Sequence, residues 1–337
     1  MPHRNIPIFI PHMGCPNQCV FCNQRSISGC HSFREDAVRE QIEEALSTLL
    51  VGADTEIAFF GGSFTGIDRD LMLRLLDVAE SYVDAGRVSG IRLSTRPDYI
   101  DDEILQILSR YSVRVIELGL QSMDDGVLLA SKRGHTAKDA ERACRAVREA
   151  GFSLVGQMMI GLPQSSLEME LRTAQKICEL GACAARIYPT VVFYDTPLCE
   201  MVRDGSYTPL SLDEAVTRAA RVLRVFEEHG VPCIRIGLCA GEELTSPDAV
   251  MAGPNHPALG ELVRSECAYD ELLTTVRDAG LLGREISLRL PHKRVSCIVG
   301  QHRKNINKLE QQTATRVMRI TGENIEQILP QVWQKTE

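Results

Sequence analysis

The sequence predicts an α/β fold in which a parallel sheet curls into a partial or full barrel and a small α+β module follows it. Short apolar runs alternate with longer amphipathic stretches over about two thirds of the 337 residues, as in chains of βα units. From residue 285 the order changes to strand, helix, helix and strand. Hydrophobic residues make up 44% of the chain, which suffices for a conventional core.

The expected elements follow one another regularly. A strand over residues 6–11 precedes an amphipathic helix over 35–50, the strand EIAFF over 56–60 and a helix from about 68 to 85. Further strands, separated by helical stretches, are expected at residues 90–95, 114–120, 153–162, 185–189 and 233–238. This number of βα units fits a TIM-type barrel, whose functional residues lie at the carboxyl ends of the strands.

Three cysteines stand close together directly after the first strand. Cys15, Cys19 and Cys22 have the spacing C-x3-C-x2-C. On one tight loop, three thiolates can bind three irons of a four-iron cluster and leave the fourth iron open to another ligand. An open metal position indicates chemistry at the metal and not electron transfer alone.

Two other kinds of cysteine site compete with this interpretation. A zinc site would use His12 or Cys30 as a fourth ligand, whereas Phe21, between two of the cysteines, suits a shielded cluster better. A disulfide framework is disfavoured because the chain starts without a secretory leader and is expected in the reducing cytoplasm. The cysteines outside the triplet form no second C-x2-C pair, so no auxiliary cluster is expected.

Candidate ligand-binding residues lie where the second and third strands end. Gly61 and Gly62 allow a ligand to approach the backbone closely, and Ser63 adds a hydroxyl, although a Gly-Gly pair after a strand is often only a turn. Arg96 can face an anion or a carboxylate on the barrel rim. Asp98 is expected to cap the next helix.

The later strand ends add polar groups. Glu117 and Gln121 can hydrogen-bond a ribose, with a structural ion pair inside the barrel as the equal alternative for Glu117. Arg133 can bind a carboxylate through two parallel hydrogen bonds. Gly161 shapes a turn against which a flat adenine can lie, and Tyr188 either lines the substrate side or packs inside the barrel.

Seven segments together resemble a known family. They are NIPIFIPHMGCPNQCVFCNQ, FFGGSFTG, STRPDYI, IELGLQSMDDGVL, KRGHT, QMMIGLP and RIYPTVVFYDTPL. Their order and spacing resemble the radical S-adenosylmethionine (radical SAM) half of the catalytic subunit of Elongator, which modifies the wobble uridine of transfer RNA. A looser resemblance extends to the oxygen-independent coproporphyrinogen oxidases. The resemblance covers residues 5–240.

The resemblance implies a radical SAM barrel and an enzyme that reductively cleaves S-adenosylmethionine at a 4Fe-4S cluster, forming a 5′-deoxyadenosyl radical. The substrate that the resemblance favours for this enzyme is a base in RNA, most of all in transfer RNA. The electron donor that it implies is a flavodoxin or a ferredoxin. The resemblance assigns the cluster to Cys15, Cys19 and Cys22. It assigns the cofactor's amino group to Gly61 and Gly62 with Ser63 beside them, its ribose and carboxylate to Gln121 and Arg133, and its adenine to Gly161 and Leu162.

This chain also departs from that family. It ends where the Elongator subunit continues into an acetyltransferase domain, so no acetyl-donor site is expected within it. Ser94 and Arg186 stand where the family is expected to have a glutamate and a lysine. After the barrel there is no clear cysteine-rich zinc segment, since Cys233 and Cys239 do not form a familiar ligand pair.

The C-terminal segment resembles a KH RNA-binding module, in which a GxxG loop joins two helices. The loop here is GQHR, so Arg303 replaces the second glycine. The candidate RNA-binding residues are Gly300, Gln301, His302, Arg303 and Lys304. From residue 289 to 319 eight lysines and arginines face one acid, Glu310, although the whole chain carries a net charge of −8. A local basic surface suits phosphate binding, and a module that only packs against the barrel is the alternative.

We therefore expect a radical SAM barrel over residues 1–240, a connecting segment packed on it over 241–283, and a basic KH-like module over 284–337. The alternative functions are a radical SAM enzyme for a small molecule, tetrapyrrole or peptide, and a non-catalytic RNA-binding protein. No membrane partner is expected, because no apolar run approaches the roughly 20 residues that a membrane span needs. The sequence predicts no particular oligomeric state.

Overall fold

The computed structural model describes residues 3–11, 13–15, 19–23, 33–48, 54–238 and 249–334. The chain divides into two compact units. The first unit consists of Met1–Ala215 and Val225–Pro257, and the second of Val216–Arg224 and Ala258–Glu337. The three-part division expected from the sequence stays a prediction.

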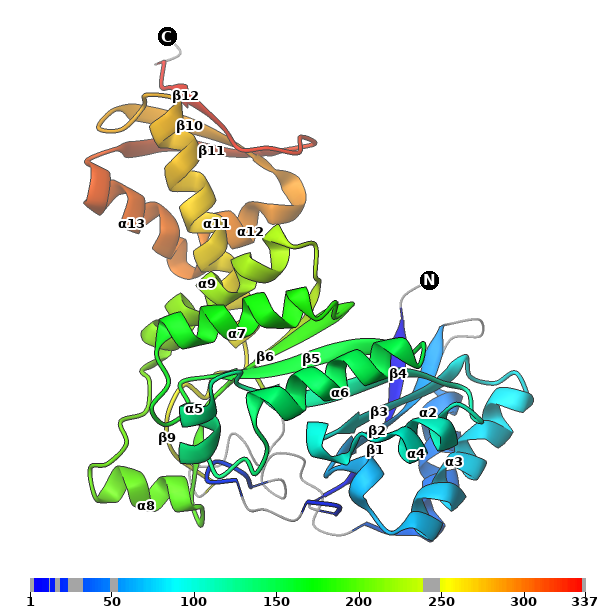
Figure 1. Ribbon diagram of the computed structural model, residues 1–337. Coiled ribbons are helices and arrows are strands. Elements are labelled where there is room, and N and C mark those ends of the chain that lie inside the picture. The colour runs from blue at the N-terminus through cyan, green and yellow to red at the C-terminus, as the bar shows by residue number, and fades with distance from the viewer. Residues whose placement is uncertain are drawn as a thin grey trace. The chain divides into compact units, whose positions relative to one another are not determined.

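The first unit contains a parallel sheet that, in the described residues, has seven strands in the order β1-β2-β3-β4-β5-β6-β8 (Figure 1). These strands are β1 (Arg4–Ile10), β2 (Thr55–Gly61), β3 (Gly90–Thr95), β4 (Val113–Gln121), β5 (Ser153–Ile160), β6 (Ala184–Pro189) and β8 (Cys233–Ile236). β1 and β8 form the two edges of this open sheet, so of the two predicted barrels the partial one is observed.

Helices connect consecutive strands, as the βα alternation predicts. They are α2 (Val38–Ser47), α3 (Arg69–Asp84), α4 (Asp102–Leu108), α5 (Asp125–Ala130), α6 (Ala137–Glu149), α7 (Leu167–Glu179), α8 (Pro197–Arg203) and α9 (Leu212–Glu228). Figure 1 shows α6 and α7 lying across β4, β5 and β6. All crossovers join parallel strands, so the carboxyl ends of the strands, with the predicted site residues, share one edge of the sheet.

Side chains alternate between the two faces of the strands. In β2, Ile57 and Phe59 are fully buried core residues, whereas the intervening Ala58 and the preceding Glu56 lie on the opposite face. Glu56 is only 2% exposed, and the same inner face carries Arg92 of β3. The inner face is thus lined by polar and charged groups as well as apolar ones.

Several helices begin at a capping side chain, which satisfies otherwise unpaired backbone N–H groups. Asp101 caps α4 by accepting a hydrogen bond from the backbone N–H of Ile104 over 2.8 Å. The prediction that Asp98 caps this helix is wrong, because the Asp98 carboxylate is bound by the guanidinium group of Arg96 instead.

The second unit is built on α11 (Leu259–Asp278), β10 (Glu285–Pro291), α12 (Val295–Val299), α13 (Lys304–Thr313), β11 (Arg316–Glu323) and β12 (Leu329–Val332). Its described sheet has the order β11-β10-β12, with β11 parallel and β12 antiparallel to the central β10. The predicted order of strand, helix, loop, helix and strand is confirmed.

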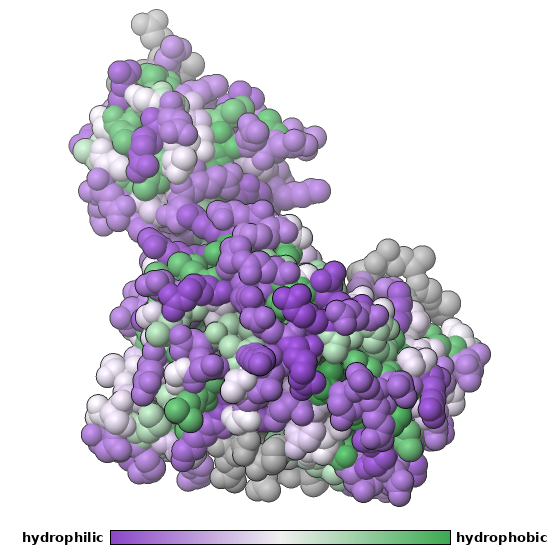
Figure 2. Space-filling view, viewed as in Figure 1, coloured by the Kyte–Doolittle hydropathy of each residue, from purple (hydrophilic) through white to green (hydrophobic). Residues whose placement is uncertain are grey.

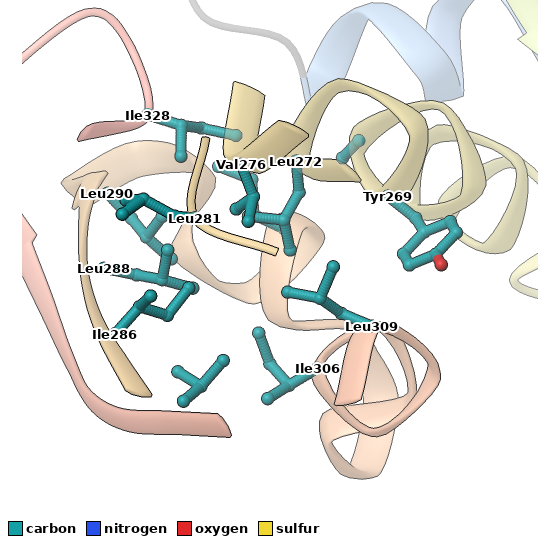
Figure 3. Close-up of a cluster of buried hydrophobic side chains, with 13 residues drawn as sticks. Tyr269, Leu272, Val276, Leu281, Ile286, Leu288, Leu290, Ile306, Leu309 and Ile328 are labelled. Atoms are coloured by element: carbon teal, nitrogen blue, oxygen red, sulfur yellow. The ribbon is translucent and has the colours of Figure 1, made fainter. Parts of the chain in front are cut away.

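One apolar cluster holds the second unit together (Figure 3). Ile286, Leu288 and Leu290 of β10 point to the same side of the sheet, as the two-residue repeat of a strand requires. Ile306 and Leu309 of α13 and Tyr269, Leu272 and Val276 of α11 pack against them. α11 therefore completes this core, although it lies within residues 241–283, which were expected to form a connecting segment packed on the barrel.

Hydrophilic residues cover most of the visible surface of both units (Figure 2). No helix in the described part of the chain combines the length and the apolar character that a membrane span requires.

Candidate functional site

The three cysteines lie on the loop that follows β1. Cys19 is 5% exposed, and Cys15 and Cys22 are half-buried. The backbone N–H of Cys22 donates to the carbonyl oxygen of Cys19 over 3.0 Å, which closes a tight turn between the last two cysteines. His12, Cys30 and Cys239 fall outside the described residues, and among the described ones no three His, Cys, Asp or Glu side chains gather as ligands of one metal ion.

The first part of this loop is held by the Gly-Gly element at the end of β2. The N–H of Gly62 donates to the carbonyl oxygen of Ile10 over 2.7 Å, and that of Ser63 donates to Met13 over 2.9 Å. A Cβ atom on Gly62 would lie 1.9 Å from the carbonyl oxygen of Met13, and one on Gly14 would lie 2.2 Å from that of Ser63. Both glycines are therefore needed for the two loops to pack; the cofactor contacts of Gly61 and Gly62 stay predictions.

The second part of the loop is anchored at Val20. Its N–H donates to the carbonyl oxygen of Ser131 over 3.1 Å, and its own carbonyl oxygen accepts from the N–H of Leu198 over 2.9 Å. Phe21 packs against the apolar cluster that includes Val192 and Leu198. Phe21 thus joins the cysteine loop to the small antiparallel pair β7 (Val192–Phe193) and β9 (Val250–Ala252) and to α8.

The Ser63 hydroxyl belongs to a buried chain of hydroxyl groups. Its Oγ lies 2.7 Å from Oγ1 of Thr95 and accepts from the backbone N–H of Arg96 over 3.2 Å. Oγ1 of Thr65 also lies 2.7 Å from that of Thr95 and donates to the carbonyl oxygen of Tyr99. The predicted ligand hydroxyl of Ser63 is therefore engaged between the ends of β2 and β3.

Arg133 lies beside the cysteines. Its Nη1 donates to Sγ of Cys19 over 3.5 Å, and its Nη2 donates to the carbonyl oxygen of Gly119 over 2.6 Å. The side chain is buried, and its Nε has no hydrogen-bond partner within the described structure. A buried, unpaired N–H group is costly unless a ligand accepts from it. The arginine predicted to hold the cofactor thus adjoins a cysteine predicted to hold the cluster.

A second arginine, Arg96, lies next to Arg133. The two arginines and the neighbouring cysteine loop are called the cationic corner. The guanidinium group of Arg96 binds the Asp98 carboxylate through Nε and Nη2, and Nη2 also donates to the carbonyl oxygen of Arg133 over 2.6 Å. Its Nη1 is buried without a partner among the described groups. Burial raises the pKa of the Cys15 thiol, and the charges of Arg133 and Arg96 oppose that rise.

His135 was not singled out in the sequence, although it stands in the KRGHT segment. Its ring is fully buried, with Nδ1 4.0 Å from Oδ1 of Asp98. Burial, and then the charge of Arg133, lower the pKa of His135 to about 4. The imidazole of His135 is therefore neutral at physiological pH, and it lies near Asp98, the partner of Arg96.

Gln121 and Arg133 share the space that Gly119 leaves free. A Cβ on Gly119 would lie 2.9 Å from Nη2 of Arg133 and 3.0 Å from Nε2 of Gln121. Gln121 has a left-handed backbone, with φ 66°, and its Oε1 accepts from Gln157 over 3.4 Å. Gly119 was not among the residues singled out from the sequence, although a glycine inside a predicted strand is a signal of such close packing.

Glu117 occupies a structural ion-pair network on the inner face of the sheet. Its Oε1 lies 2.8 Å from Nη1 of Arg92, and its Oε2 lies 2.7 Å from Nε of Arg186. The guanidinium group of Arg186 also lies over the ring of Phe60, 5.6 Å from its centroid. Burial disfavours the charge of Arg186, but the carboxylate of Glu117 keeps its pKa above the ordinary value. Of the two roles considered for Glu117, the ion pair is the one observed.

The turn after β5 is closed by contacts within the chain. The N–H of Gly161 donates to Oε1 of Glu170 over 2.7 Å, and its carbonyl oxygen accepts from the hydroxyl of Tyr207 over 2.6 Å. Leu162 is 2% exposed and belongs to the core. The expected position of Gly161 and Leu162 near an adenine stays a prediction.

The chemistry of this corner suits an anionic metal cluster with an amino-acid ligand. Three thiols stand on one loop, and two buried guanidinium groups beside them retain unpaired N–H groups, Nη1 of Arg96 and Nε of Arg133. Thiolates are the ligands of iron–sulfur clusters, and guanidinium groups bind carboxylates. The residues therefore fit a 4Fe-4S cluster on Cys15, Cys19 and Cys22 with a carboxylate-bearing cofactor next to it.

A family model described as the radical SAM superfamily matches residues 9–177, the part of the chain that carries this corner. The chain belongs to the radical SAM superfamily. A second model, described as the radical SAM C-terminal domain, matches residues 183–269. This radical SAM protein is therefore an enzyme whose cofactors are a 4Fe-4S cluster and S-adenosylmethionine.

Its curated relatives include the Elongator complex protein 3 of Bos taurus, which is 32% identical over 70% of this chain and 52% of the relative. A tRNA uridine(34) acetyltransferase of Methanocaldococcus jannaschii is 31% identical over 48% of this chain and 34% of its own length. An uncharacterized protein of the same archaeon is 28% identical over 74% of this chain and 78% of its own length. The chain is thus homologous to the radical SAM region of Elongator complex protein 3, and spans about half of the bovine relative.

Two solved structures have a similar fold. The archaeal Elp3 of Methanocaldococcus infernus aligns with a TM-score of 0.60 at 21% identity, over 84% of this chain and 66% of that one. The methylornithine synthase PylB aligns with a TM-score of 0.51 at 16% identity, over 75% of each chain. Both confirm the predicted radical SAM fold.

The loop of the KH-like module has a conformation that glycine normally adopts. Between α12 and α13, Gly300 has φ 77°, and His302 and Arg303 have φ 50° and 62°. A non-glycine residue in the left-handed region costs about 1–2 kcal/mol. Gln301, His302, Arg303 and Lys304 are all exposed. Arg303, at the position of the second glycine of the GxxG pattern, therefore has a backbone conformation that glycine adopts readily, and it adds a charge.

Acidic residues outside the basic segment neutralise part of its charge. Arg294 pairs with Glu271 and Lys308 with Glu266, both on α11, and Arg289 pairs with Glu323. The positive charge counted along the sequence is therefore weaker on the folded surface. Arg303, in the loop itself, is among the basic residues that these three ion pairs do not neutralise.

Proposed function

We propose that this radical SAM enzyme modifies a base in RNA, with transfer RNA as the favoured substrate. The observation that carries the proposal is the presence, in one chain, of the radical SAM domain and of the exposed loop Gly300–Lys304, which has positive φ at Gly300, His302 and Arg303. The curated relatives add support, since one of them is a tRNA uridine(34) acetyltransferase. When bound, the cluster and S-adenosylmethionine supply one-electron reductive cleavage chemistry.

The chain's own residues hold and shield this chemistry. In the proposal, Cys15, Cys19 and Cys22 bind the cluster, Gly61, Gly62 and Ser63 border the amino group, and Gln121 and Arg133 bind the ribose and carboxylate. Gly161 and Leu162 border the adenine. Arg133 suits its role because its guanidinium group is fastened to Gly119 and retains a buried, unpaired Nε–H. Val20 and Phe21 fasten the cysteine loop and help to exclude water from it.

The RNA would meet the second unit at the loop Gly300–Lys304. Its exposed cation Arg303 suits contact with phosphates, which would make the affinity depend strongly on salt. A flavodoxin or ferredoxin would supply the electron, and the reducing cytoplasm is the proposed location because cluster thiolates must stay reduced.

The first experiment asks whether RNA is the substrate. The full chain, reconstituted anaerobically and reduced with dithionite, is incubated with S-adenosylmethionine and transfer RNA, and 5′-deoxyadenosine is measured. We expect cofactor cleavage to increase when transfer RNA is added and to be lost in Cys15→Ala. The variant Lys304→Glu, which leaves the cofactor domain unchanged, should lose the increase but keep the basal cleavage.

Two outcomes would contradict the proposal. No binding of RNA at low salt, together with cleavage that RNA does not change, would favour a radical SAM enzyme for a small molecule, tetrapyrrole or peptide. RNA binding without any cofactor cleavage by cluster-loaded protein would favour a non-catalytic RNA-binding protein. Mass-spectrometric profiling of nucleosides from cells with and without the gene would then identify the modified base.

A further inference from the structure

The Arg96 side chain is more deeply buried than its interactions explain. It is 2% exposed, whereas the side chain of its only acidic partner in the described structure, Asp98, is 25% exposed. Nη1 of Arg96 has no partner there at all. Burying a charge with an unused N–H group is unfavourable. A residue that folding alone had selected at this position would pair all of its donors or be apolar.

Arg96 holds Arg133 in place. Nη2 of Arg96 donates to the carbonyl oxygen of Arg133 over 2.6 Å, and the side chain of Arg133 in turn donates to Sγ of Cys19. The backbone N–H of Arg96 is itself fastened to Ser63, next to the Gly-Gly element that carries the cysteine loop. Arg96, which directly follows β3, therefore connects the end of β2 with the segment after α5 that carries Arg133.

The corner also carries excess positive charge. Arg96 and Arg133 are two cations, Asp98 is one anion, and the neighbouring His135 is neutral because its ring is fully buried. Arg96 contacts Arg133, whose guanidinium group donates to Sγ of Cys19, so both cations lie near the cysteine loop. Solvent screens the field of a charge in a buried site far less than that of a charge at the surface.

We propose that Arg96 is a positioning residue of the cofactor site: it orients Arg133 beside Cys19, and its buried charge raises the reduction potential of the 4Fe-4S cluster. Reduction adds one negative charge to the cluster, so a fixed positive charge nearby stabilises the reduced form. The inference depends on the cluster and not on the proposed RNA substrate.

The test measures the reduction potential and not only activity. Full-length wild type, Arg96→Gln and Arg96→Lys are reconstituted, their iron per chain is determined, and their midpoint potentials are measured by EPR-monitored titration without S-adenosylmethionine. We expect a more negative midpoint for Arg96→Gln and a smaller shift for Arg96→Lys, which keeps the charge. Arg74→Gln, which removes an exposed cation paired with Glu35, is the matched control and should keep the wild-type midpoint.

The variant Asp98→Asn provides an opposite change at the same place. It removes the anion that offsets Arg96, so the midpoint should become less negative. Wild-type midpoints in Arg96→Gln at full iron content would overturn the proposal. If Arg96→Gln does not retain the cluster, an unchanged midpoint in Asp98→Asn would overturn it instead, since a purely structural role would leave the potential where it is.

Discussion

Gly62 and Met13 pack so closely that a single added carbon would not fit between them: a Cβ on Gly62 would lie 1.9 Å from the carbonyl oxygen of Met13. The N–H of the next residue, Ser63, donates to the same carbonyl group. The loop that presents the cysteines is thus supported by the backbone of the neighbouring strand end. This arrangement explains the glycine at position 62 before any ligand is considered.

Replacing Gly62 with alanine should displace the cysteine loop. Overpacking of this kind costs about 1–3 kcal/mol, and here it falls on the cluster ligands. We expect Gly62→Ala to bind less iron per chain after reconstitution. Gly126→Ala is the control, because its Cβ would meet only the Asp124 side chain, 3.2 Å away. Full iron content in Gly62→Ala would show that the loop does not depend on this contact.

Neutralising Glu117 should destabilise the first unit. The carboxylate lies between Arg92 and Arg186 and is 2% exposed, so its loss leaves the buried Arg186 without its anion and leaves Arg92 with Glu56 alone. Removing one partner of a buried ion pair typically costs about 3–5 kcal/mol. We expect Glu117→Gln to lower the midpoint of denaturant unfolding strongly. The exposed pair of Arg69 and Glu103 provides the control, since Glu103→Gln should cost less than about 1 kcal/mol.

His135 should make the protein less stable in mild acid. Its pKa is about 4 in the folded state against 6.5 for an ordinary histidine, so the unfolded chain binds the proton first as the pH falls. The free energy of unfolding therefore falls as the pH drops from about 6.5 to 4, and His135 lowers it no further below pH 4. At pH 5 the loss amounts to roughly 2 kcal/mol.

The variant His135→Gln isolates this contribution. It should lose less stability than the wild type between pH 7.5 and pH 5 in denaturant unfolding. His229→Gln, which replaces an exposed histidine, should follow the wild-type pH dependence. Identical slopes for His135→Gln and the wild type would mean that His135 titrates normally in the folded protein.

Arg303 allows the backbone and the charge of the loop to be separated. Because Arg303 has φ 62°, Arg303→Gly should relieve strain and leave the unfolding free energy unchanged or up to about 1 kcal/mol higher. The same variant should bind transfer RNA more weakly, with the slope of log affinity against log salt reduced by about one. Arg303→Lys, which keeps the charge, should retain both the affinity for transfer RNA and its salt dependence. Tighter RNA binding by Arg303→Gly would instead indicate that the arginine side chain obstructs the RNA backbone.

The elements of the fold could be predicted because their signals are local. β3 was expected at residues 90–95 and is observed at Gly90–Thr95, and the helix expected after the GQHR loop is α13, Lys304–Thr313. Strand and helix formation depend on the periodicity and side-chain shape of neighbouring residues. The open edges at β1 and β8 depend on which strands pair, so the sequence left a partial and a full barrel as alternatives.

The cofactor site was harder to predict at the level of single side chains. Asp98 has the local position of a helix cap, yet its carboxylate binds Arg96, and Asp101 caps the helix. Gly119 and His135 gave little local signal, because their importance comes from side chains of other strands and loops. A motif of contiguous residues does not indicate which side chains meet across the ends of neighbouring strands.

The sequence by itself determined the family, the order of the βα units and the spacing of Cys15, Cys19 and Cys22, because each of these is written in contiguous residues. Only the tertiary structure decided what surrounds the cysteines. It brought Arg96 and Arg133 together with unpaired N–H groups beside the thiols, and it engaged the Ser63 hydroxyl between two strand ends. Parallel strands place residues that are far apart in sequence at one edge of a sheet, and burial there determines which charges remain to act on a cofactor.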